Sequence, residues 1–502
     1  MSIERLSPYI DGRHVESAAE RYMPIYDPSI GEIIAETPCC TAGEVSAAVA
    51  AAKAAFPGWA NTPCPKRVEV LYRFRELLIA HLDELTYGLC RENGKNWDEA
   101  RGDLLKVKEP VEVAIGAPSL MMGESLMNVT QGFDSTLYRE PVGVFAGIAP
   151  FNFPAMIPMG WMMPMCIATG NTLVLKAASM TPMTSLRLVE LLTEAGLPKG
   201  VVNVVTCSRN EAELLLSHPD VKGITFVGST KIGRHIYATA AASGKRVQCL
   251  CEAKNHALVL EDTPIERTVA GILNSSFGCA GERCMALPVI VVQESIADAV
   301  AAELLRQVKK KKIGPAYDKT TDLGPVVTAE HRKFVTDWIE TGVREGAELI
   351  LDGRNVVVPG YENGFYLGHT ICDHVTPEMR VVQSEVFGPV LCVKRVKDFE
   401  EGLSVMNANP FANGSVIFTQ NGYYAREFAK RTHGGMVGVN VGIPVPAGMF
   451  PFCGHKNSFF GDLHVLGKDG LRFYTESKTV TTRWFDEETM KQSHVGTWDG
   501  AL

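Results

Sequence analysis

The segment Ser275–Met285, SSFGCAGERCM, places a thiol, a permanent cation and several small residues close together in the chain. Cys284 directly follows Arg283, and a guanidinium beside a thiol is expected to lower the thiol pKa and increase the nucleophilic thiolate at neutral pH. The small residues leave space for a flat ligand and free backbone N–H groups to point at developing negative charge. We therefore predict that Cys284 is a catalytic nucleophile. For Cys279, earlier in the segment, we predict the buried structural role that most cysteines have.

The segment GITFVGSTKIG contains a candidate site for a pyrophosphate. Its apolar strand leads into Gly228 and Ser229, and Gly233 falls inside the helix expected to follow. Backbone N–H groups at a helix start, together with the Ser229 hydroxyl, can bind such an anion. The spacing departs from GxGxxG, so a glycine turn with a serine N-cap is the alternative interpretation.

The segment NTLVLKAAS ends an apolar strand at Lys176. A cation at the carboxyl edge of a parallel sheet lies where such sheets bind ligands, so this ammonium could donate to ribose hydroxyls. A lysine that simply extends from the strand end into solvent is an equal alternative.

Two further motifs place a polar side chain next to aromatic residues. In PFNFP, Asn152 follows Phe151 at the end of a predicted strand, where a rigidly held amide could donate to an oxyanion. In SEVFGPV, Glu385 precedes Phe387 and a Gly-Pro turn, and its carboxylate could accept hydrogen bonds from sugar hydroxyls. Taken singly, a turn-forming asparagine and an exposed carboxylate are the simpler interpretations.

Alternating strands and helices are predicted to position these motifs. Between residues 142 and 250, apolar strands alternate with helices in the rhythm of a doubly wound parallel sheet. A second α/β unit follows, with strands predicted at 257–260, 288–292, 390–396 and near 414–419.

The regions outside this α/β core have their own signals. Small antiparallel strands are predicted in residues 8–35, and a helix at Thr41–Phe56 begins with a capping box of Thr41 and Glu44. Residues 126–141 and 471–485 are β-prone and have no clear core face. We predict that these two segments form an arm, paired within or between subunits.

Length and charge limit the class of protein. The chain has 502 residues, too many for one core, and its net charge of −8 argues against nucleic acid as the main partner. Residues 141–175 carry no charge and are long enough to span a membrane. Because prolines at 150, 154, 158 and 164 interrupt that segment, we predict a buried strand, a loop, a helix and a second strand instead of a membrane span.

The cysteines and the N-terminus bear on the compartment. The chain has thirteen cysteines with no CxxC and no zinc-finger spacing, so no metal site is predicted. No apolar signal segment follows Met1. These features fit a reducing cytoplasm, and they do not distinguish a prokaryotic cytoplasm from an organelle matrix after presequence removal.

Together and in this order, the motifs resemble those of the aldehyde dehydrogenase superfamily, over nearly the whole chain. Finer features are similar to its CoA-acylating methylmalonate/malonate semialdehyde dehydrogenase branch: AKNH at Ala253–His256, ERCMAL at Glu282–Leu287 and the tail at Pro444–Asp462. The resemblance implies an α/β fold with a Rossmann-like cofactor domain, an α/β catalytic domain and a β oligomerisation arm. The implied boundaries are 1–125 with 142–252 for the first, 253–446 for the second, and 126–141 with 470–502 for the arm.

The resemblance also implies roles for the motif residues. Cys284 is the nucleophile, and its backbone N–H forms an oxyanion hole with Asn152. Arg283 and Lys106 bind a substrate carboxylate. NAD is the implied cofactor, CoA the acyl acceptor, and a dimer or tetramer the implied assembly. The residues that the resemblance implies for cofactor binding are Phe151, Lys176, Ser179, Gly228, Ser229, Gly233, Glu385 and Phe387.

Two positions depart from most of the superfamily. A glutamate that activates water usually stands four residues before the lysine of ELGGK, and with Lys254 as the anchor Leu250 takes its place. The acylating branch also lacks this glutamate, since a CoA thiol with a pKa near ~8.5 needs no strong base. Glu252 stands where the family usually has glycine. Because residues two apart share a face of an extended segment, Glu252 could act as a base or obstruct the site.

Two further departures concern specificity. The branch has arginine where this chain has Lys106, which keeps the charge but not the planar fork that binds a carboxylate. An anionic substrate is therefore expected without its identity being determined. Ser179 replaces the glutamate that NAD-preferring members carry three residues after the ribose lysine, so NADP with its 2′-phosphate would be tolerated.

We therefore predict NAD(P)-dependent, CoA-acylating oxidation of methylmalonate or malonate semialdehyde to propionyl-CoA or acetyl-CoA, with loss of carbon dioxide. The first alternative is a non-acylating dehydrogenase that releases the free acid. The second is a non-enzymatic binding or structural protein on the same scaffold. The presence of Cys284, Asn152 and Glu385 argues against the second alternative.

Overall fold

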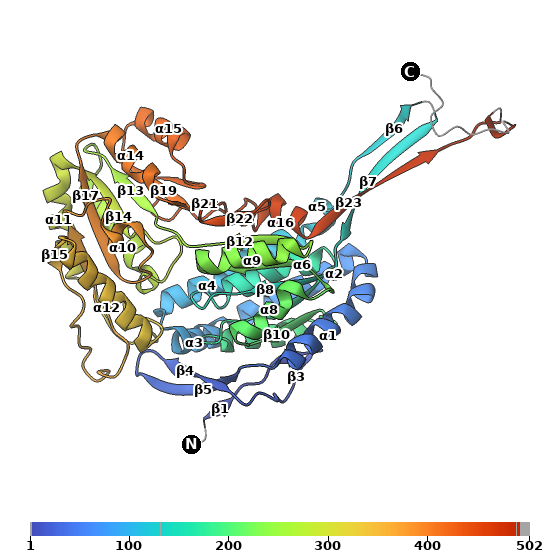
Figure 1. The fold of residues 1–502 in the computed structure, drawn as a ribbon, viewed down its shortest axis with the longest axis horizontal. Helices are drawn as coiled ribbons and strands as arrows, with labels where there is room; N and C mark the ends of the chain where they lie inside the picture. Colours follow the sequence, from blue (N-terminus) through green and yellow to red (C-terminus); the bar gives the residue numbers. More distant parts are fainter. Residues whose placement is uncertain (1–2, 131, 488, 492–502) are drawn as a thin grey trace.

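The computed structural model describes residues 3–130, 132–487 and 489–491. Two sheets with parallel cores, each covered by helices, lie next to each other, and a long three-stranded arm projects away from them (Figure 1). A small sheet near the N-terminus combines β1 (Glu4–Arg5), β5 (Glu32–Pro38) and β4 (Tyr22–Asp27). Strands β4 and β5 are antiparallel, as predicted, whereas β1 runs parallel to β5.

The first large sheet has the strand order β22-β12-β11-β8-β9-β10-β2-β3. Its five central strands are parallel, and the outer strands β22, β2 and β3 pair in antiparallel fashion. The doubly wound sheet predicted between residues 142 and 250 is therefore confirmed. The bounds are β22 (Phe459–Gly461), β12 (Arg246–Leu250), β11 (Val221–Val227), β8 (Val144–Ile148), β9 (Thr172–Lys176), β10 (Val202–Val205), β2 (Tyr9–Ile10) and β3 (Arg13–His14).

The second large sheet has the order β15-β16-β17-β14-β13-β19-β20, parallel except for the edge strand β15. Its strands match the four predicted ones within a residue and add three more. They are β15 (Glu348–Leu351), β16 (Thr370–Asp373), β17 (Val390–Val396), β14 (Val289–Gln293), β13 (His256–Val259), β19 (Gly414–Phe418) and β20 (Met436–Val439). A short pair, β18 (Phe411–Ala412) and β21 (His455–Lys456), lies beside it.

Helices cover both sheets (Figure 1). The predicted capping box is present at the start of α1: the Glu44 N–H donates to the Thr41 hydroxyl, and the Thr41 N–H donates to the Glu44 carboxylate. The longer helices are α1 (Ala42–Asn61), α2 (Cys64–Ala80), α3 (Leu82–Asn93), α4 (Trp97–Ile115), α7 (Met183–Glu194), α8 (Arg209–Ser217), α9 (Thr230–Ala242), α10 (Ile265–Phe277), α11 (Glu294–Val308), α12 (Ala329–Arg344), α14 (Phe399–Ala408) and α15 (Gly422–Arg431). The shorter ones are α5 (Ala117–Leu120), α13 (Arg380–Gln383) and α16 (Gly467–Phe473).

The uncharged segment forms a buried helix between β8 and β9. It opens as a π-helix at Met156–Met162 and continues as α6 (Met163–Ala168), packed against α4. The predicted helix is present, and it opens with wide turns, because Pro158 and Pro164 donate no backbone hydrogen bond. In the part of the chain that the structure describes, no helix is long and apolar enough to cross a membrane.

The arm combines segments that are far apart in the sequence. Strand β7 (Phe133–Pro141) pairs with β6 (Ser125–Thr130) on one side and with β23 (Thr475–Arg483) on the other, both antiparallel (Figure 1). The predicted pairing of the two β-prone segments is thus confirmed. The prediction that the second strand begins at residue 471 is wrong, because residues 471–473 end α16 and Leu471 and Phe473 are buried in the core. Residues 492–502 of the predicted arm lie outside the described residues.

Asn171 joins the roots of the two arm segments to the first sheet. Its side-chain oxygen accepts the N–H groups of Val142 and Gly143, at 2.7 and 2.9 Å, just before β8. Its side-chain nitrogen donates to the Tyr474 carbonyl, 2.8 Å away, just before β23. Asn171 is completely buried, so these groups have no access to water in its absence.

We expect Asn171→Ala to lower the free energy of unfolding by about 2 kcal/mol or more, because it leaves buried N–H and C=O groups unpaired. The midpoint of urea denaturation measures the effect. Asn210→Ala, at an exposed position of α8, is the control and should change stability by less than about 0.5 kcal/mol. Equal stability of the two variants would contradict the role given to Asn171.

Candidate active site

A cavity of about 350 Å³ lies between α4 and the loop that follows α10. Part of the cavity wall consists of apolar and aromatic side chains. The thiol of Cys284, the predicted nucleophile, also lies in this wall. Among the lining residues are the predicted site residues Lys106, Arg283 and Cys284 and the aromatic residues Phe153, Trp161 and Phe452.

The loop that holds Cys284 is bent by an unusual backbone. After α10, Cys279, Ala280 and Gly281 have left-handed φ angles of 55°, 51° and 72°. A Cβ atom at Gly281 would lie 2.1 Å from the Gly388 carbonyl oxygen, so only glycine fits there. These constraints determine where the chain turns before it reaches Cys284.

Asn255 holds the backbone at Cys284 and just after it. Its side-chain nitrogen donates to the carbonyls of Cys284 and Ala286, both at 2.8 Å, and its oxygen accepts the Gly414 N–H at 2.7 Å. Sequence reasoning noted Asn255 only as part of AKNH. The motif AKNH, which is shared with the branch, was the available signal. No pattern in the sequence indicated which backbone groups Asn255 would bind.

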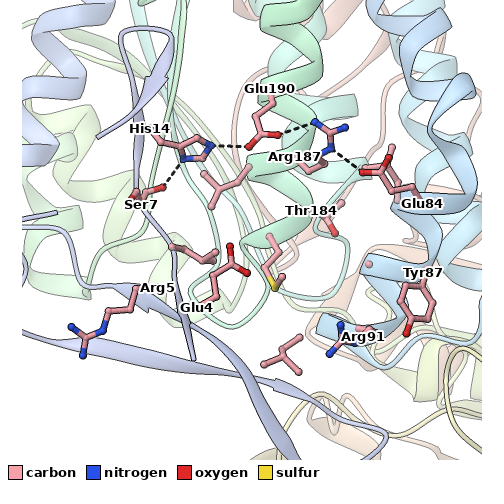
Figure 2. A pocket seen from close by; sticks show the side chains of 16 residues that line it. Glu4, Arg5, Ser7, His14, Glu84, Tyr87, Arg91, Thr184, Arg187 and Glu190 are labelled. Carbon is pink, nitrogen blue, oxygen red and sulfur yellow. Dashed lines mark hydrogen bonds and ion pairs between the residues drawn. The ribbon is translucent and has the colours of Figure 1, made fainter. Parts of the chain in front are cut away.

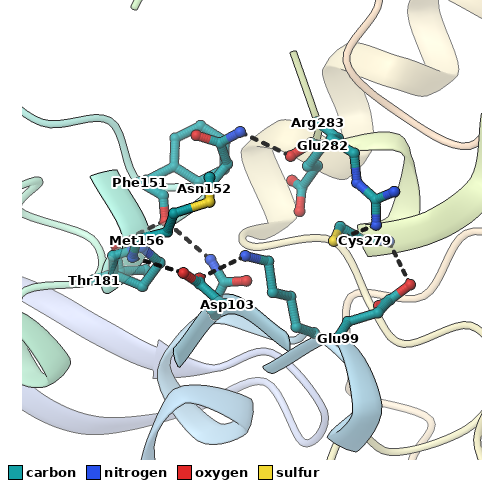
Figure 3. A network of polar contacts seen from close by, with 12 residues as sticks. Glu99, Asp103, Phe151, Asn152, Met156, Thr181, Cys279, Glu282 and Arg283 are labelled. Carbon is teal, nitrogen blue, oxygen red and sulfur yellow. Dashed lines mark hydrogen bonds and ion pairs between the residues drawn. The ribbon is translucent and has the colours of Figure 1, made fainter. Parts of the chain in front are cut away.

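Asn152 is buried and held rigidly beside the same loop. Its amide nitrogen donates to the Glu282 carbonyl at 2.9 Å (Figure 3). The preceding carbonyl, of Phe151, accepts hydrogen bonds from Thr181 and Asn93 at 2.9 and 3.0 Å. Since an amide nitrogen carries two N–H groups and Glu282 uses one, Asn152 can donate the other to an oxyanion formed next to Cys284.

The expected lowering of the Cys284 pKa is wrong for this structure. The pKa of the thiol is raised to about 12, mainly by burial and also by the nearby Glu385 carboxylate, and Arg283 lowers it only in part. The Arg283 guanidinium instead donates to the sulfur of Cys279, 3.1 Å away (Figure 3). Exclusion of water therefore outweighs the adjacent cation. Cys279 itself is buried, as predicted.

A network of buried charges on α4 supports the cavity (Figure 3). The Lys95 ammonium contacts the Asp103 carboxylate at 2.8 Å and lies over the ring of Phe153, 3.4 Å from its centroid. Asp103 also accepts the Met156 N–H, and Glu99 accepts the Cys279 N–H at 2.6 Å. Sequence analysis missed this network, because its members are recognisable only once α4 lies against the Cys284 loop.

Lys106 lies at the edge of the cavity with its ammonium half exposed. It contacts the Glu109 carboxylate at 2.7 Å, and Glu109 also accepts the Gly448 N–H at 2.8 Å. The structure thus brings Lys106 to the same cavity as Arg283 and Cys284, and it adds a carboxylate that partly compensates the lysine charge.

The glycine-serine turn lies at the start of α9. A Cβ atom at Gly233 would lie 2.3 Å from the Cys251 sulfur, so glycine allows α9 to pack closely on β12. Ser229 is the N-cap residue of α9, as the alternative interpretation expected, but it is exposed and its hydroxyl makes no capping hydrogen bond. The backbone N–H groups that open α9 follow Gly228 at the carboxyl end of β11.

Lys176 ends β9, which β8 separates from β11, at the same edge of the sheet. Burial lowers the pKa of its ammonium, and within the described ranges its ammonium has no hydrogen-bond or ion-pair partner. Ser179 follows in the loop before α7 and is half-buried. A helix start, an unpaired ammonium and this loop are suited to the phosphates and riboses of a dinucleotide.

Glu385, Phe387 and Phe151 approach the site from the second sheet and from β8. Glu385 accepts the Ala253 N–H at 3.1 Å, and burial raises its pKa to about 8. The rings of Phe151 and Phe387 meet edge to face with centroids 5.8 Å apart. His331, which sequence analysis missed, contacts both rings and lies 2.7 Å from the Phe387 carbonyl oxygen.

Leu250 and Glu252, the two positions that differ from most of the superfamily, lie in different surroundings. Leu250 is buried in the apolar cluster against which Cys284 packs, so no carboxylate is present at that position. The carboxylate of Glu252 accepts the Thr230 N–H at 3.0 Å, at the start of α9. Glu252 is therefore engaged with the helix in this structure.

A second cavity, of about 540 Å³, lies between the N-terminal strands and helices α3 and α7 (Figure 2). Four of its charged or titratable side chains contact one another: Glu190 contacts His14 and Arg187, and Arg187 also contacts Glu84. None of the predicted site residues lines it. Among the residues with described positions, no group of His, Cys, Asp or Glu is suited to holding a metal ion, and the thirteen cysteines are free thiols.

The parallel sheets, the cavity and its thiol define the class of protein. Residues 14–480 match the aldehyde dehydrogenase family, and the chain belongs to that family. The predicted fold class and the resemblance to this family are thereby confirmed.

The relatives narrow the comparison to one branch. The chain is 46% identical over 483 residues to malonate-semialdehyde dehydrogenase 1 of Geobacillus thermodenitrificans, with 96% of this chain and 99% of that protein covered. The solved methylmalonate-semialdehyde dehydrogenase of Oceanimonas doudoroffii is 43% identical, with a TM-score of 0.95 over 97% of this chain and 100% of that one. A Sinorhizobium meliloti structure, described as a methylmalonate-semialdehyde dehydrogenase and complexed with NAD, has a TM-score of 0.95 at 42% identity, with 97% and 99% covered.

The pKa values of Cys284 and Glu385 predict how the thiol reacts in the ligand-free protein. With a pKa of about 12, the thiol is protonated at pH 7, so its alkylation by iodoacetamide should accelerate as the pH rises. Above pH 8 Glu385 ionises and opposes formation of the thiolate. We expect Glu385→Gln to alkylate at Cys284 about threefold faster than the wild type above pH 9 and equally fast below pH 7.

Mass spectrometry of the peptide that contains both Cys279 and Cys284 measures this rate, with the buried Cys279 as internal control. Fast alkylation of Cys284 at pH 6 in the wild type would contradict the assignment of a raised pKa.

Proposed function

We propose that the protein catalyses NAD-dependent, CoA-acylating oxidation of malonate or methylmalonate semialdehyde to acetyl-CoA or propionyl-CoA, with loss of carbon dioxide. The observation that carries the proposal is one cavity lined by Cys284 and by two cations, Arg283 and Lys106. The resemblance to the family puts Leu250 where most members carry a water-activating carboxylate. The similarity to malonate- and methylmalonate-semialdehyde dehydrogenases over nearly the full chain supports the proposal.

The first half of the proposed reaction forms an acyl enzyme. The Cys284 thiolate attacks the aldehyde carbon, and the resulting oxyanion accepts hydrogen bonds from the Asn152 amide and the Cys284 backbone N–H. NAD, when bound, accepts the hydride from this carbon, which leaves a thioester on Cys284. The residues that would hold it include Lys176, Glu385 and the turn Gly228–Ser229.

The proton of the Cys284 thiol must leave for the attack to occur. Glu385 is the nearby group whose charge opposes thiolate formation, and its pKa of about 8 lies close to neutrality. Where Glu385 is ionised, above about pH 8, engagement of its carboxylate with ribose hydroxyls would draw the negative charge away from the sulfur. Binding of the cofactor would thus make the thiol easier to ionise.

The second half releases the product. A malonyl or methylmalonyl thioester can lose carbon dioxide, because the thioester carbonyl accepts the electron pair and the resulting enolate takes up a proton. A CoA thiolate then attacks the thioester and releases Cys284. At pH 7 a few per cent of a thiol with a pKa near ~8.5 is ionised, so this step requires no strong protein base.

Three further properties belong to the proposal. NAD is the preferred cofactor, and NADP is tolerated because Ser179 offers no negative charge against a 2′-phosphate. The chain assembles as a dimer or tetramer, supported by exposed apolar residues on the arm such as Leu126, Met127 and Val480; the solution mass tests this assignment. Its free thiols suit a reducing compartment such as the cytoplasm.

Incubation of the enzyme, NAD and malonate semialdehyde with and without CoA tests the reaction. We expect acetyl-CoA and turnover only in the presence of CoA, and a single burst of NADH without it. Product identification by mass spectrometry separates this outcome from hydrolysis, which would give a free acid at a rate independent of CoA.

Cys284→Ala should reduce turnover by more than about a hundredfold, because it removes the atom that carries the acyl group. Cys453→Ala is the matched control, since this thiol lies outside the residues that line the cavity, and it should retain activity. Activity of Cys284→Ala above about 1% of the wild-type activity would refute the assignment of Cys284 as the nucleophile.

The role of Lys106 in binding a substrate carboxylate predicts a dependence on substrate charge. Lys106→Met should lower kcat/KM for malonate semialdehyde by about tenfold and leave kcat/KM for neutral propanal within about twofold. Glu109→Gln frees Lys106 from its partner and should raise kcat/KM for the anionic substrate. An equal effect of Lys106→Met on both aldehydes would show that the lysine has only a structural role.

A further inference from the structure

The start of α9 holds an anion that comes from a distant part of the chain. The Thr230 N–H, the first of the helix, donates to the Glu252 carboxylate at 3.0 Å. The first turn of α9 contains no acidic residue, and the hydroxyl of the N-cap Ser229 makes no capping bond. Glu252 therefore supplies the negative charge that a helix N-terminus favours.

The place that Glu252 occupies adjoins both parts of the proposed dinucleotide site. The Gly228 N–H donates to the Leu250 carbonyl at 3.0 Å, so the turn before α9 lies against the end of β12. The next residue after Glu252, Ala253, donates its N–H to Glu385. The charge of Glu252 also contributes to the raised pKa of Glu385, which shows that the two carboxylates lie close enough to repel each other.

A carboxylate and a phosphate compete for the same donors at a helix start, because both accept hydrogen bonds from its free N–H groups and both interact with the helix dipole. A pyrophosphate that reaches Thr230 must replace the hydrogen bond to Glu252. If the Glu252 carboxylate stays nearby, it also repels the phosphate charge.

We propose that Glu252 is a specificity-determining residue of the cofactor site, where its carboxylate occupies the position of the pyrophosphate and must be displaced when the dinucleotide binds. The inference rests on the proposed function, since it assumes that the dinucleotide binds at the start of α9. Glu252 then weakens binding of the cofactor in proportion to its phosphate charge. It leaves the adenine and ribose contacts unaffected.

Two ligands and three variants test this inference by isothermal titration without any turnover. ADP-ribose carries the pyrophosphate, and adenosine carries none. Glu252→Gln keeps the shape and the hydrogen-bond acceptor but removes the charge, and Glu252→Ala removes the side chain beyond Cβ. Glu213→Gln is the matched control, because the Glu213 carboxylate also contacts α9, through His235, but away from its first turn.

We expect both Glu252 variants to bind ADP-ribose about 3- to 10-fold more tightly than the wild type, and to bind adenosine within about twofold of it. Glu213→Gln should match the wild type with both ligands. Unchanged or weaker binding of ADP-ribose by Glu252→Gln, in a protein whose circular dichroism and melting temperature equal those of the wild type, overturns the inference. Equal tightening for adenosine also overturns it, because the effect would then not involve phosphate.

Failure of the proposed function has a different signature. A wild-type protein that binds neither ADP-ribose nor NAD overturns the cofactor assignment and this inference with it. A wild-type protein that binds ADP-ribose and forms NADH from the semialdehyde, with Glu252 variants that bind like the wild type, overturns only the role of Glu252.

Discussion

Exclusion of water from the cavity around Cys284 is the constraint on which the site depends. Burial is the largest cause of the raised pKa values of Cys284, Glu385, Glu99 and Asp103. In such surroundings an unpaired charge is costly, which explains why Lys95 contacts Asp103. The same low polarity would strengthen any hydrogen bond that Asn152 donates to an oxyanion. A site that disfavours a thiolate before ligands bind can thus stabilise the charge that forms during the reaction.

The backbone places the thiol in this cavity with little freedom. Three consecutive left-handed residues, Cys279 to Gly281, bend the chain after α10, and the close approach of Gly281 to Gly388 leaves no space for a side chain. Asn255, directly before β13, then holds the carbonyls of Cys284 and Ala286. Because Asn152 is held to the Glu282 carbonyl in the same loop, the candidate oxyanion donor and the thiol are positioned by one connected set of hydrogen bonds.

At the carboxyl edge of the first sheet, one charged side chain is unpaired among the described residues and another is already engaged. Lys176 offers an ammonium without a partner in the described part of the chain, whereas Glu252 already fills the start of α9. Glu385 joins the two regions through Ala253. Competition between protein carboxylates and ligand phosphates at this edge is consistent with an enzyme that must bind its cofactor and also release it in every cycle.

Local sequence was sufficient to predict the parallel strands of the first sheet and four strands of the second, because apolar runs and turn residues act over a few positions; it did not predict β15, β16 and β20. It also singled out Cys284, Asn152, Lys176 and Glu385 as candidate site residues, since they stand in motifs that resemble those of the aldehyde dehydrogenase family. The tertiary structure alone decided that Arg283 contacts Cys279, that burial outweighs this cation at Cys284, and that Asn255 holds the loop. Each of these depends on distances between segments far apart in the chain and on the exclusion of water between them, and neither quantity is contained in a local pattern of residues.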